Sequence, residues 1–307
     1  MKKFVLNSFL FVAFVTLLYF FCVILVGGLN WNIKNSNLKF PIAGYGHLKT
    51  RINQIRNDKY DVLFVGSSHA YRGFDPRIFK NHGFRSFNLG STGQTPTITQ
   101  TLLERYVRKL NPKLVIYEVY PLTLYSNGVE SALDLIANDI VDHRSFELAI
   151  DLNDIRIYNA LIYSSFLDLF DLKSKIQEDR RKGFDTYIDG GFVEKDLKFY
   201  DSTKNYINKP LPFSTDLGIF KSNISFLKSL NIPVILVFAP ITKAYYASFE
   251  KKKEFDSEME KIGPYINFNV ENEFVDSLDF YDTNHLNKFG VLKMNQLLVD
   301  YIKTSYH

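Results

Sequence analysis

Three short motifs carry the residue types that acyl-transfer chemistry uses. A Gly-Ser-Ser-His motif at 66–69 directly follows an apolar run at 62–65, and Asn-Leu-Gly-Ser-Thr-Gly-Gln stands at 88–94. The third motif, Asp-Thr-Asn-His at 282–285, lies close to the C-terminus. Serine-based acyl transfer needs a nucleophile, donors for an oxyanion, and a histidine paired with a carboxylate. The three motifs together offer each of these parts.

Each motif has a simpler explanation when it is taken alone. Ser67 and Ser68 could merely cap a following helix, which serine does well. Asp282 and His285 could belong to a surface loop or to half of a metal site. As partners of Ser68 they have a defined use, because His285 can take a proton near neutral pH while Asp282 fixes its tautomer. The combination therefore indicates a serine nucleophile with its base.

The first half of the chain predicts the start of an α/β sheet. The segment 61–65 is a short, β-branched apolar run before a glycine, and it predicts a buried strand. Further strands are expected at 85–88 and 114–119, with a helix at 95–110 that ends at Asn-Pro. This order is typical of a parallel sheet covered by helices, whose ligands bind outside the carboxyl ends of the strands.

The pattern resumes after a long insert at about 124–213. The part of the insert up to about residue 172 is expected to be helical, and the later, glycine-containing part is expected to be turns or loop. Helices are predicted at 41–57, 217–230, 241–262 and 287–302, and strands at 233–238 and 266–270. The insert could form a cap over a cleft, or it could be a peripheral helical decoration.

The three motifs resemble those of the SGNH/GDSL hydrolase superfamily. Gly66-Ser67-Ser68 matches its Gly-Asp-Ser block with serine in the middle, and Asn88 to Gly93 matches its Asn-x-x-x-x-Gly block. Asp282 and His285 match its Asp-x-x-His block. The resemblance covers about 61–120 and 233–302. It implies a flavodoxin-like three-layer α/β fold in which Ser68 is the nucleophile, His285 the base and Asp282 its partner. The N–H groups of Ser68 and Gly93 would form the oxyanion hole.

One block of the superfamily is missing. Its Gly-x-Asn-Asp block supplies an asparagine as an oxyanion donor, but the third strand here runs into Glu118-Val119-Tyr120-Pro121. Losing one such donor can cost on the order of a hundred- to a thousandfold in rate. Tyr120 or Gln94 could substitute, two backbone N–H groups could suffice, or catalysis could be lost. This form, with an N-terminal anchor, resembles membrane-anchored SGNH-like proteins of bacterial envelope and exopolysaccharide acylation.

The N-terminus is apolar enough to enter a membrane. Residues 4–26 contain no charge and exceed the roughly 20 residues that span a bilayer. A cleaved signal peptide is the alternative, although no Ala-x-Ala site follows. Lys2 and Lys3 favour a cytoplasmic N-terminus in the inner membrane, with the rest of the chain outside. We predict a stub and anchor at 1–28, a linker and leading helix at 29–57, and the α/β domain at 58–305.

Composition and motif searches exclude several classes of function. The net charge is only +4 and no concentrated basic stripe is present, which disfavours a nucleic-acid partner. No P-loop or Gly-x-Gly-x-x-Gly motif is found, and no set of three or four metal ligands has recognisable spacing. We therefore expect neither a metal nor a cofactor. The single cysteine, Cys22, lies in the apolar segment, so the exported part has no disulfide.

The sequence thus predicts a membrane-anchored esterase or O-acyltransferase that acts on acylated glycans, with a membrane-bound acyl-transfer protein as a conceivable partner. The alternative is a non-catalytic glycan-binding or scaffold protein, and a secreted lipase is a more distant one. Other side chains near the motifs could contact substrate, although His69 could simply pack and Arg72 could form a salt bridge. These candidate contacts are His69, Arg72, Gln94, Glu118 and Tyr120.

Overall fold

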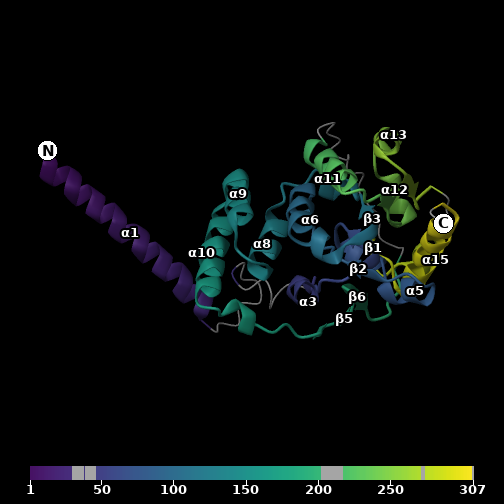
Figure 1. Ribbon diagram of the computed structural model, residues 1–307, viewed down its shortest axis with the longest axis horizontal. Coiled ribbons are helices and arrows are strands. Elements are labelled where there is room, and N and C mark those ends of the chain that lie inside the picture. The colour runs from purple at the N-terminus through teal and green to yellow at the C-terminus, as the bar shows by residue number, and fades with distance from the viewer. Residues whose placement is uncertain (30–37, 39–45, 202–216, 271–273, 306–307) are drawn as a thin grey trace. The chain divides into compact units, whose positions relative to one another are not determined.

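The chain forms two compact units in the computed structural model (Figure 1). The first comprises 1–44 and 132–178, and the second comprises 45–131 and 179–307. The structure describes residues 1–29, 38, 46–201, 217–270 and 274–305. Most of the predicted linker, the start of the leading helix at 41–45 and the end of the insert near 213 lie outside the described residues. The predicted domain boundaries stay predictions.

A five-stranded parallel sheet forms the centre of the second unit. Its order is β2-β1-β3-β7-β8, and all neighbouring strands run parallel. The chain passes from β1 outward to β2 and then back to β3 on the other side. Open α/β sheets bind ligands where the strand order diverges in this way, which here is at the carboxyl ends of β1 and β3. The predicted flavodoxin-like sheet is confirmed. The strands are β1 (Tyr60–Val65), β2 (Ser86–Asn88), β3 (Pro112–Glu118), β7 (Val234–Phe238) and β8 (Tyr265–Asn267).

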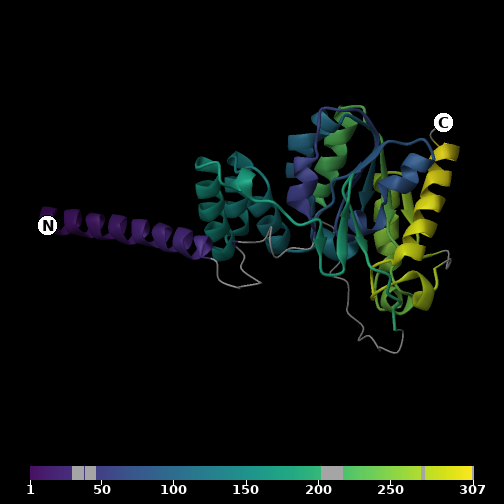
Figure 2. The same ribbon diagram turned by 90° about the horizontal axis from the view of Figure 1, so that it is seen from below.

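Helices cover both faces of this sheet, which gives the expected three layers (Figures 1 and 2). Alternate residues of β3 face opposite layers. Ile116 belongs to the same buried cluster as Met294 of α15, whereas the Tyr117 ring lies 5.0 Å from the Phe220 ring of α11. The covering helices are α6 (Pro96–Leu110) and α11 (Gly218–Ser229) on one face, and α4 (Ser68–Gly73), α5 (Pro76–Asn81) and α15 (Lys288–Ser305) on the other.

Two expectations about the later elements are corrected. The predicted helix at 241–262 is two helices, α12 (Lys243–Ala247) and α13 (Lys252–Ile262). The chain turns between them through Lys251, whose φ is +54°, and buries Phe249 against Tyr245. The last strand, β8, ends at Asn267 instead of residue 270. The remaining short helices are α3 (Leu48–Asn53), α7 (Pro121–Leu124), α14 (Asp276–Asp279) and the 3-10 helix η2 (Lys173–Lys175).

The late part of the insert is a small antiparallel sheet, where the sequence predicted only turns or loop. Gly190 and Gly191 form the turn between its second and third strands. Asn88 donates its N–H to Gly190 O over 2.7 Å, and Arg51 donates to Gly191 O. A Cβ on Gly191, whose φ is +97°, would lie only 2.2 Å from Asn88 O. The turn therefore packs against the outer edge of β2. The strands are β4 (Arg181–Lys182), β5 (Asp185–Ile188) and β6 (Phe192–Lys195).

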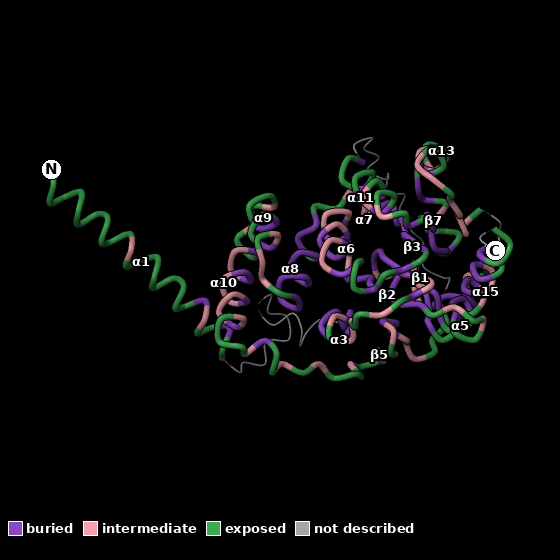
Figure 3. The backbone as a smooth tube through the Cα atoms, in the orientation of Figure 1, coloured by how far each residue is buried: buried purple, intermediate pink, exposed green. Residues whose placement is uncertain are grey.

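The first unit is helical, as predicted for the early part of the insert. Its N-terminal helix α1 (Lys2–Gly28) is almost wholly exposed (Figure 3). Near its end it contacts α10, where the Tyr163 hydroxyl donates to Gly27 O over 2.8 Å. Within the described part of the chain, α1 alone is long and apolar enough to cross a membrane. The other helices are α8 (Val129–Asn138), α9 (His143–Leu152) and α10 (Ile155–Leu169).

Candidate active site

Ser68 stands at the turn between β1 and α4. Gly66 follows the strand with a φ of +138°, and Ser67 then caps the helix by accepting the His69 N–H over 3.2 Å. Ser68 is the first helical residue and is half-buried. Because parallel strands end at one edge, this turn places the Ser68 hydroxyl at the carboxyl edge of the sheet. Ser67 does cap a helix, while Ser68 is left for another partner.

Ser68, His285 and Asp282 are brought together although Ser68 and His285 are 217 residues apart. Ser68 Oγ lies 2.8 Å from His285 Nε2. On the other side of the ring, His285 Nδ1 lies 3.0 Å from Asp282 Oδ2 and 3.1 Å from Oδ1. Since an ionised carboxylate can only accept, Nδ1 carries the proton and Nε2 is free to accept the serine hydroxyl. This is the arrangement of a serine nucleophile with its general base.

Asp282 is held ionised by the loop that carries it. Partial burial acts to raise its pKa, but the hydrogen bond and charge of His285 outweigh burial, together with backbone N–H groups. The net effect lowers the pKa of Asp282 to about 2. The backbone donors are Asn284 and His285, whose N–H groups lie 2.9 and 2.8 Å from Oδ1. The carboxylate is therefore available to orient the imidazole throughout the neutral range.

The loop at 281–286 is closed on itself and tied to the sheet. Tyr281 donates its N–H to His285 O over 3.1 Å, and the two rings stack with planes only 4° apart. Thr242, which follows β7, donates both its N–H and its hydroxyl to Thr283 O. Asn287 closes the base of the loop by donating to Leu278 O over 2.7 Å. These bonds fix the direction in which His285 points.

The two expected oxyanion donors are available. Among the described residues, no acceptor contacts the N–H groups of Ser68 or Gly93. Gly93 has a φ of +54°, and nothing crowds the position where its Cβ would be. The loop that carries it is bound to the Ser68 turn, because Ser91 donates its N–H to Gly66 O over 3.1 Å. Unsatisfied N–H groups can stabilise a developing oxyanion when they point at the reacting carbonyl oxygen.

Asn88, the first residue of the second motif, has a structural role. It is fully buried, and its amide nitrogen donates to Ala70 O and Phe74 O over 2.7 and 3.0 Å. Its amide oxygen accepts the Gly90 N–H over 3.0 Å. Asn88 therefore ties the loop after β2 to the backbone of the helix that begins at Ser68.

The two side chains proposed as substitutes for the missing asparagine have other partners. Gln94 is 3 % exposed, and its amide nitrogen donates to Thr99 Oγ1 over 2.9 Å. The Tyr120 hydroxyl donates to the Tyr245 hydroxyl over 3.2 Å, and burial raises the pKa of Tyr120 above its usual value. These contacts favour an oxyanion hole made of backbone N–H groups.

Arg72 forms a buried ion pair. Its guanidinium nitrogens lie 2.6 and 3.3 Å from the two carboxylate oxygens of Asp185, which also contacts Lys195 over 3.3 Å. Burial opposes ionisation of Asp185, but the two cations outweigh it and lower its pKa. The pair joins α4 to β5, so Arg72 has a structural partner in place of a substrate anion. Its substrate role stays a prediction without support from these contacts.

His69 and Glu118 lie beneath the Ser68–His285 pair and are 4 % and 2 % exposed. Both contact Ser67, for which the sequence indicates only a helix cap or the middle position of the Gly-Asp-Ser block. The stacking of Tyr281 on His285 was missed as well. The available signals were the second serine of the Gly-Ser-Ser-His motif and an aromatic residue directly before Asp282.

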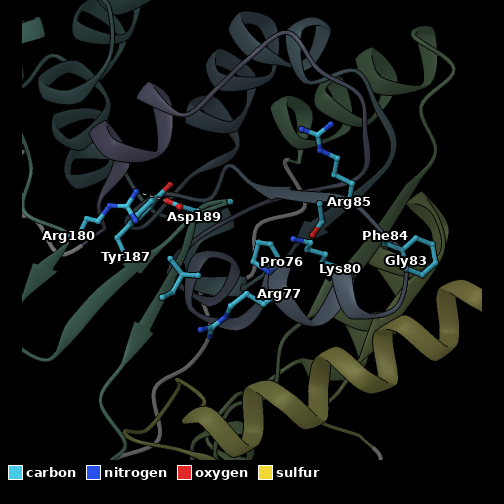
Figure 4. Close-up of a pocket in the computed structure, with 12 residues that line it drawn as sticks. Pro76, Arg77, Lys80, Gly83, Phe84, Arg85, Arg180, Tyr187 and Asp189 are labelled. Atoms are coloured by element: carbon cyan, nitrogen blue, oxygen red, sulfur yellow. Dashed lines mark hydrogen bonds and ion pairs between the residues drawn. The ribbon is translucent and has the colours of Figure 1, made fainter.

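A separate hollow of about 800 Å³ opens beside Ser86, at the amino end of β2, whereas the triad lies at the carboxyl edge. Its lining includes several basic side chains (Figure 4). Three of them have acidic partners: Arg180 pairs with Asp189, Arg85 with Asp58, and Arg77 with Asp75 and Glu194. Most of the positive charge of this hollow is thus compensated, and the hollow lies apart from Ser68 and His285.

Comparison with known proteins finds likeness at the level of structure. No protein-family model and no curated protein matches the sequence. The chain is similar to a solved structure of a proposed acylhydrolase from Bacteroides fragilis, at 13% identity and a TM-score of 0.43, covering 86% of this chain and 99% of that one. It is also similar to a GDSL-like lipase from Bacteroides thetaiotaomicron, at 13% identity and a TM-score of 0.41, covering 87% and 100%.

The structure of this chain agrees with what its motifs implied. A parallel sheet between two layers of helices is the fold expected from the SGNH/GDSL resemblance. Ser68, His285 and Asp282 lie together at the carboxyl edge of this sheet.

Proposed function

We propose that the protein is a serine-dependent acyl-ester hydrolase or O-acyltransferase. The observation that carries this proposal is the chain of contacts from Ser68 Oγ to His285 Nε2, and from His285 Nδ1 to Asp282. A serine hydroxyl needs a base within hydrogen-bond reach to become a nucleophile, and this geometry supplies one.

The reaction would proceed through an acyl-enzyme. Ser68 Oγ attacks the ester carbonyl while His285 Nε2 takes its proton, and the N–H groups of Ser68 and Gly93 hold the resulting oxyanion. The tetrahedral intermediate collapses as the alkoxide leaves with the proton from His285. A water molecule or a sugar hydroxyl then attacks the acyl-enzyme, with His285 again as base, and frees Ser68.

The substrate is proposed to be an acylated envelope or exopolysaccharide glycan. An anchor through α1 would hold the α/β domain at the outer face of the inner membrane, with Lys2 and Lys3 inside. That location would bring the site near glycan export and near a membrane-bound acyl-transfer protein. It favours transfer to a sugar hydroxyl over hydrolysis, because both steps share the acyl-enzyme and differ only in the acceptor.

A non-catalytic glycan-binding or scaffold protein is the second candidate. The observation that favours it is the sequence at the end of β3, where Glu118-Val119-Tyr120 stands in place of the asparagine donor. Four of the five candidate substrate contacts are also buried, and Arg72 is paired.

Covalent labelling separates the two candidates. The full chain, purified in detergent, is incubated with a fluorophosphonate probe, and peptides are examined by mass spectrometry for modification at Ser68. We expect labelling that is lost in Ser68→Ala and in His285→Ala but retained in Ser225→Ala, an exposed serine of α11. A folded protein that stays unlabelled would support the scaffold.

A further inference from the structure

A second Ser–His–carboxylate group lies directly beneath the first. Ser67, His69 and Glu118 are 1 %, 4 % and 2 % exposed. They come from the capping turn of α4 and from the last residue of β3. Buried polar side chains are costly unless they are hydrogen-bonded, so a cluster of three at this place calls for a physical role.

The three side chains form a directed chain of hydrogen bonds. Glu118 Oε2 accepts both the N–H and the hydroxyl of Ser67, each over 2.8 Å. Because the Ser67 hydroxyl gives its proton to the carboxylate, the contact of 3.0 Å to His69 Nδ1 must have the histidine as donor. The order is therefore His69 to Ser67 to Glu118, and it fixes the tautomer of His69.

This chain contacts the candidate active site in two ways. The ring of His69 lies on the ring of His285, with centroids 4.9 Å apart and planes at 19°. Tyr281 is also stacked with His285, at 5.5 Å and 4°. At the other end, Glu118 accepts a hydrogen bond from the backbone N–H of Ser67. Ser67 directly precedes Ser68, which carries both the proposed nucleophile and one expected oxyanion N–H.

The burial of His69 and Glu118 is compatible with a role in positioning His285. Burial and the nearby charge of His285 lower the pKa of His69 to about 3, so the ring stays neutral beside His285. A charged ring there would oppose the imidazolium that forms on His285 during catalysis. Burial raises the pKa of Glu118 to about 7, although the bonds from Ser67 oppose this. The charged and titratable side chains that face this cluster are Asp282, His285, Tyr117 and Tyr120, and the Tyr120 ring lies 4.2 Å from that of His69.

We propose that Ser67, His69 and Glu118 form a positioning network that fixes the ring plane of His285 and the backbone N–H of Ser68. The importance of this network for catalysis rests on the proposed function. Where two backbone N–H groups must act without a side-chain donor, their orientation decides how well an oxyanion is held, since oxyanion stabilisation depends on preorganised donors. The network would fix that orientation through its contacts with Ser67 and His285 on the buried side of the site.

Substitutions at His69 test this role. In the full chain in detergent, His69→Leu removes both the ring and the hydrogen bond, whereas His69→Phe keeps an aromatic ring against His285. His82→Ala, at a histidine that contacts Gln296 of α15, is the matched control. Circular dichroism establishes that each variant is folded, and Glu118→Gln and Ser67→Ala provide further variants if His69→Leu does not fold.

The first readout is turnover of p-nitrophenyl acetate. We expect His69→Leu to lower kcat at least tenfold with KM within twofold, because the substrate does not reach the buried ring. His69→Phe should recover a large part of that loss, and His82→Ala should match the wild type. A folded His69→Leu variant with wild-type kcat would overturn the inference.

The second readout does not need activity. In protein labelled with 15N-histidine, the ring nitrogens of His285 are assigned by comparison with His285→Ala. We expect their shifts to change in His69→Leu and Ser67→Ala but not in His82→Ala. If the wild type shows no turnover yet these shifts change, the proposed function fails while the positioning network stands. Unchanged His285 shifts in folded variants would contradict the network itself.

Discussion

The side chain of Glu118 fills the space beside Gly66 that the side chain of any other residue at position 66 would need. A Cβ on Gly66 would lie 2.6 Å from Glu118 Cβ and 2.7 Å from Glu118 Oε2. The φ of Gly66 is +138°, which residues with a side chain rarely adopt. The glycine before the Ser-Ser pair is thus required by the backbone and by the carboxylate packed against it.

Gly66→Ala should therefore disable the site. The new methyl group meets the buried Glu118 side chain and strains the backbone, and the strain alone costs about 1–3 kcal/mol. We expect a lower melting temperature in detergent and loss of fluorophosphonate labelling. Gly83→Ala, at another glycine with positive φ but with open space around it, is the control for the backbone effect alone.

Gly90 and Gly93 should respond differently to alanine, although both follow β2. A Cβ on Gly90 would lie 3.0 Å from Ala70 Cβ and 3.1 Å from Gly66 O, so Gly90→Ala pushes on the Ser68 turn. A Cβ on Gly93 meets only Glu130, at 4.0 Å, and its cost is the backbone strain of φ +54°. We expect esterase activity to fall further in Gly90→Ala. Equal losses would argue against the coupling of these two turns.

Asp282→Asn should abolish most of the activity without unfolding the protein. The amide can donate to His285 Nδ1, which would favour the tautomer that protonates Nε2 and blocks the base. We expect kcat to fall by roughly a thousand- to ten-thousandfold. Since the pKa of Asp282 is lowered to about 2, its protonation should produce no limb in the wild-type pH profile above about pH 4. A limb in that range that disappears in Asp282→Asn would contradict this assignment.

The Arg72–Asp185 pair should be important for stability. Removing one partner of a buried ion pair can cost about 3–5 kcal/mol when the other charge is left uncompensated. Lys195 still contacts Asp185 over 3.3 Å and should reduce that loss here. Arg72→Met is therefore expected to unfold at a lower urea concentration than the wild type. The double variant Arg72→Met with Asp185→Leu should recover part of the loss. If Arg72→Met leaves stability unchanged and alters only KM, Arg72 contacts substrate after all.

Glu118 should make stability depend on pH. Its pKa is raised in the folded protein from the usual 4.5 to about 7 by burial, so its ionisation favours the unfolded chain. Its stabilising contribution to the unfolding free energy is full below pH 4.5 and is lost as the pH rises through about 7. The loss is on the order of 3 kcal/mol. Glu118→Gln lacks this titration, so its unfolding free energy relative to the wild type should increase over that interval. A constant difference across pH would contradict a buried, titrating Glu118.

Much of the fold could be predicted because its signals are local. The apolar run at 61–65 and the Asn-Pro stop after Leu110 specify strand and helix within a few residues. The small sheet at 181–195 could not be found in this way. Its strands are two to four residues long, and they are stabilised by packing against Asn88 and Arg51 from distant parts of the chain.

The candidate site likewise combines features that local sequence determines with features that depend on long-range packing. By itself the sequence determined the identities of Ser68, Asp282 and His285, since each stands in a short motif whose residue types fit one chemistry. Only the tertiary structure decided that Ser68 and His285 lie 2.8 Å apart, and that Arg72 and Gln94 have protein partners. It alone placed Glu118 under Ser67 and His69 under His285. Such contacts join residues far apart in sequence, so their distances depend on how the sheet and its loops pack, which no local pattern specifies.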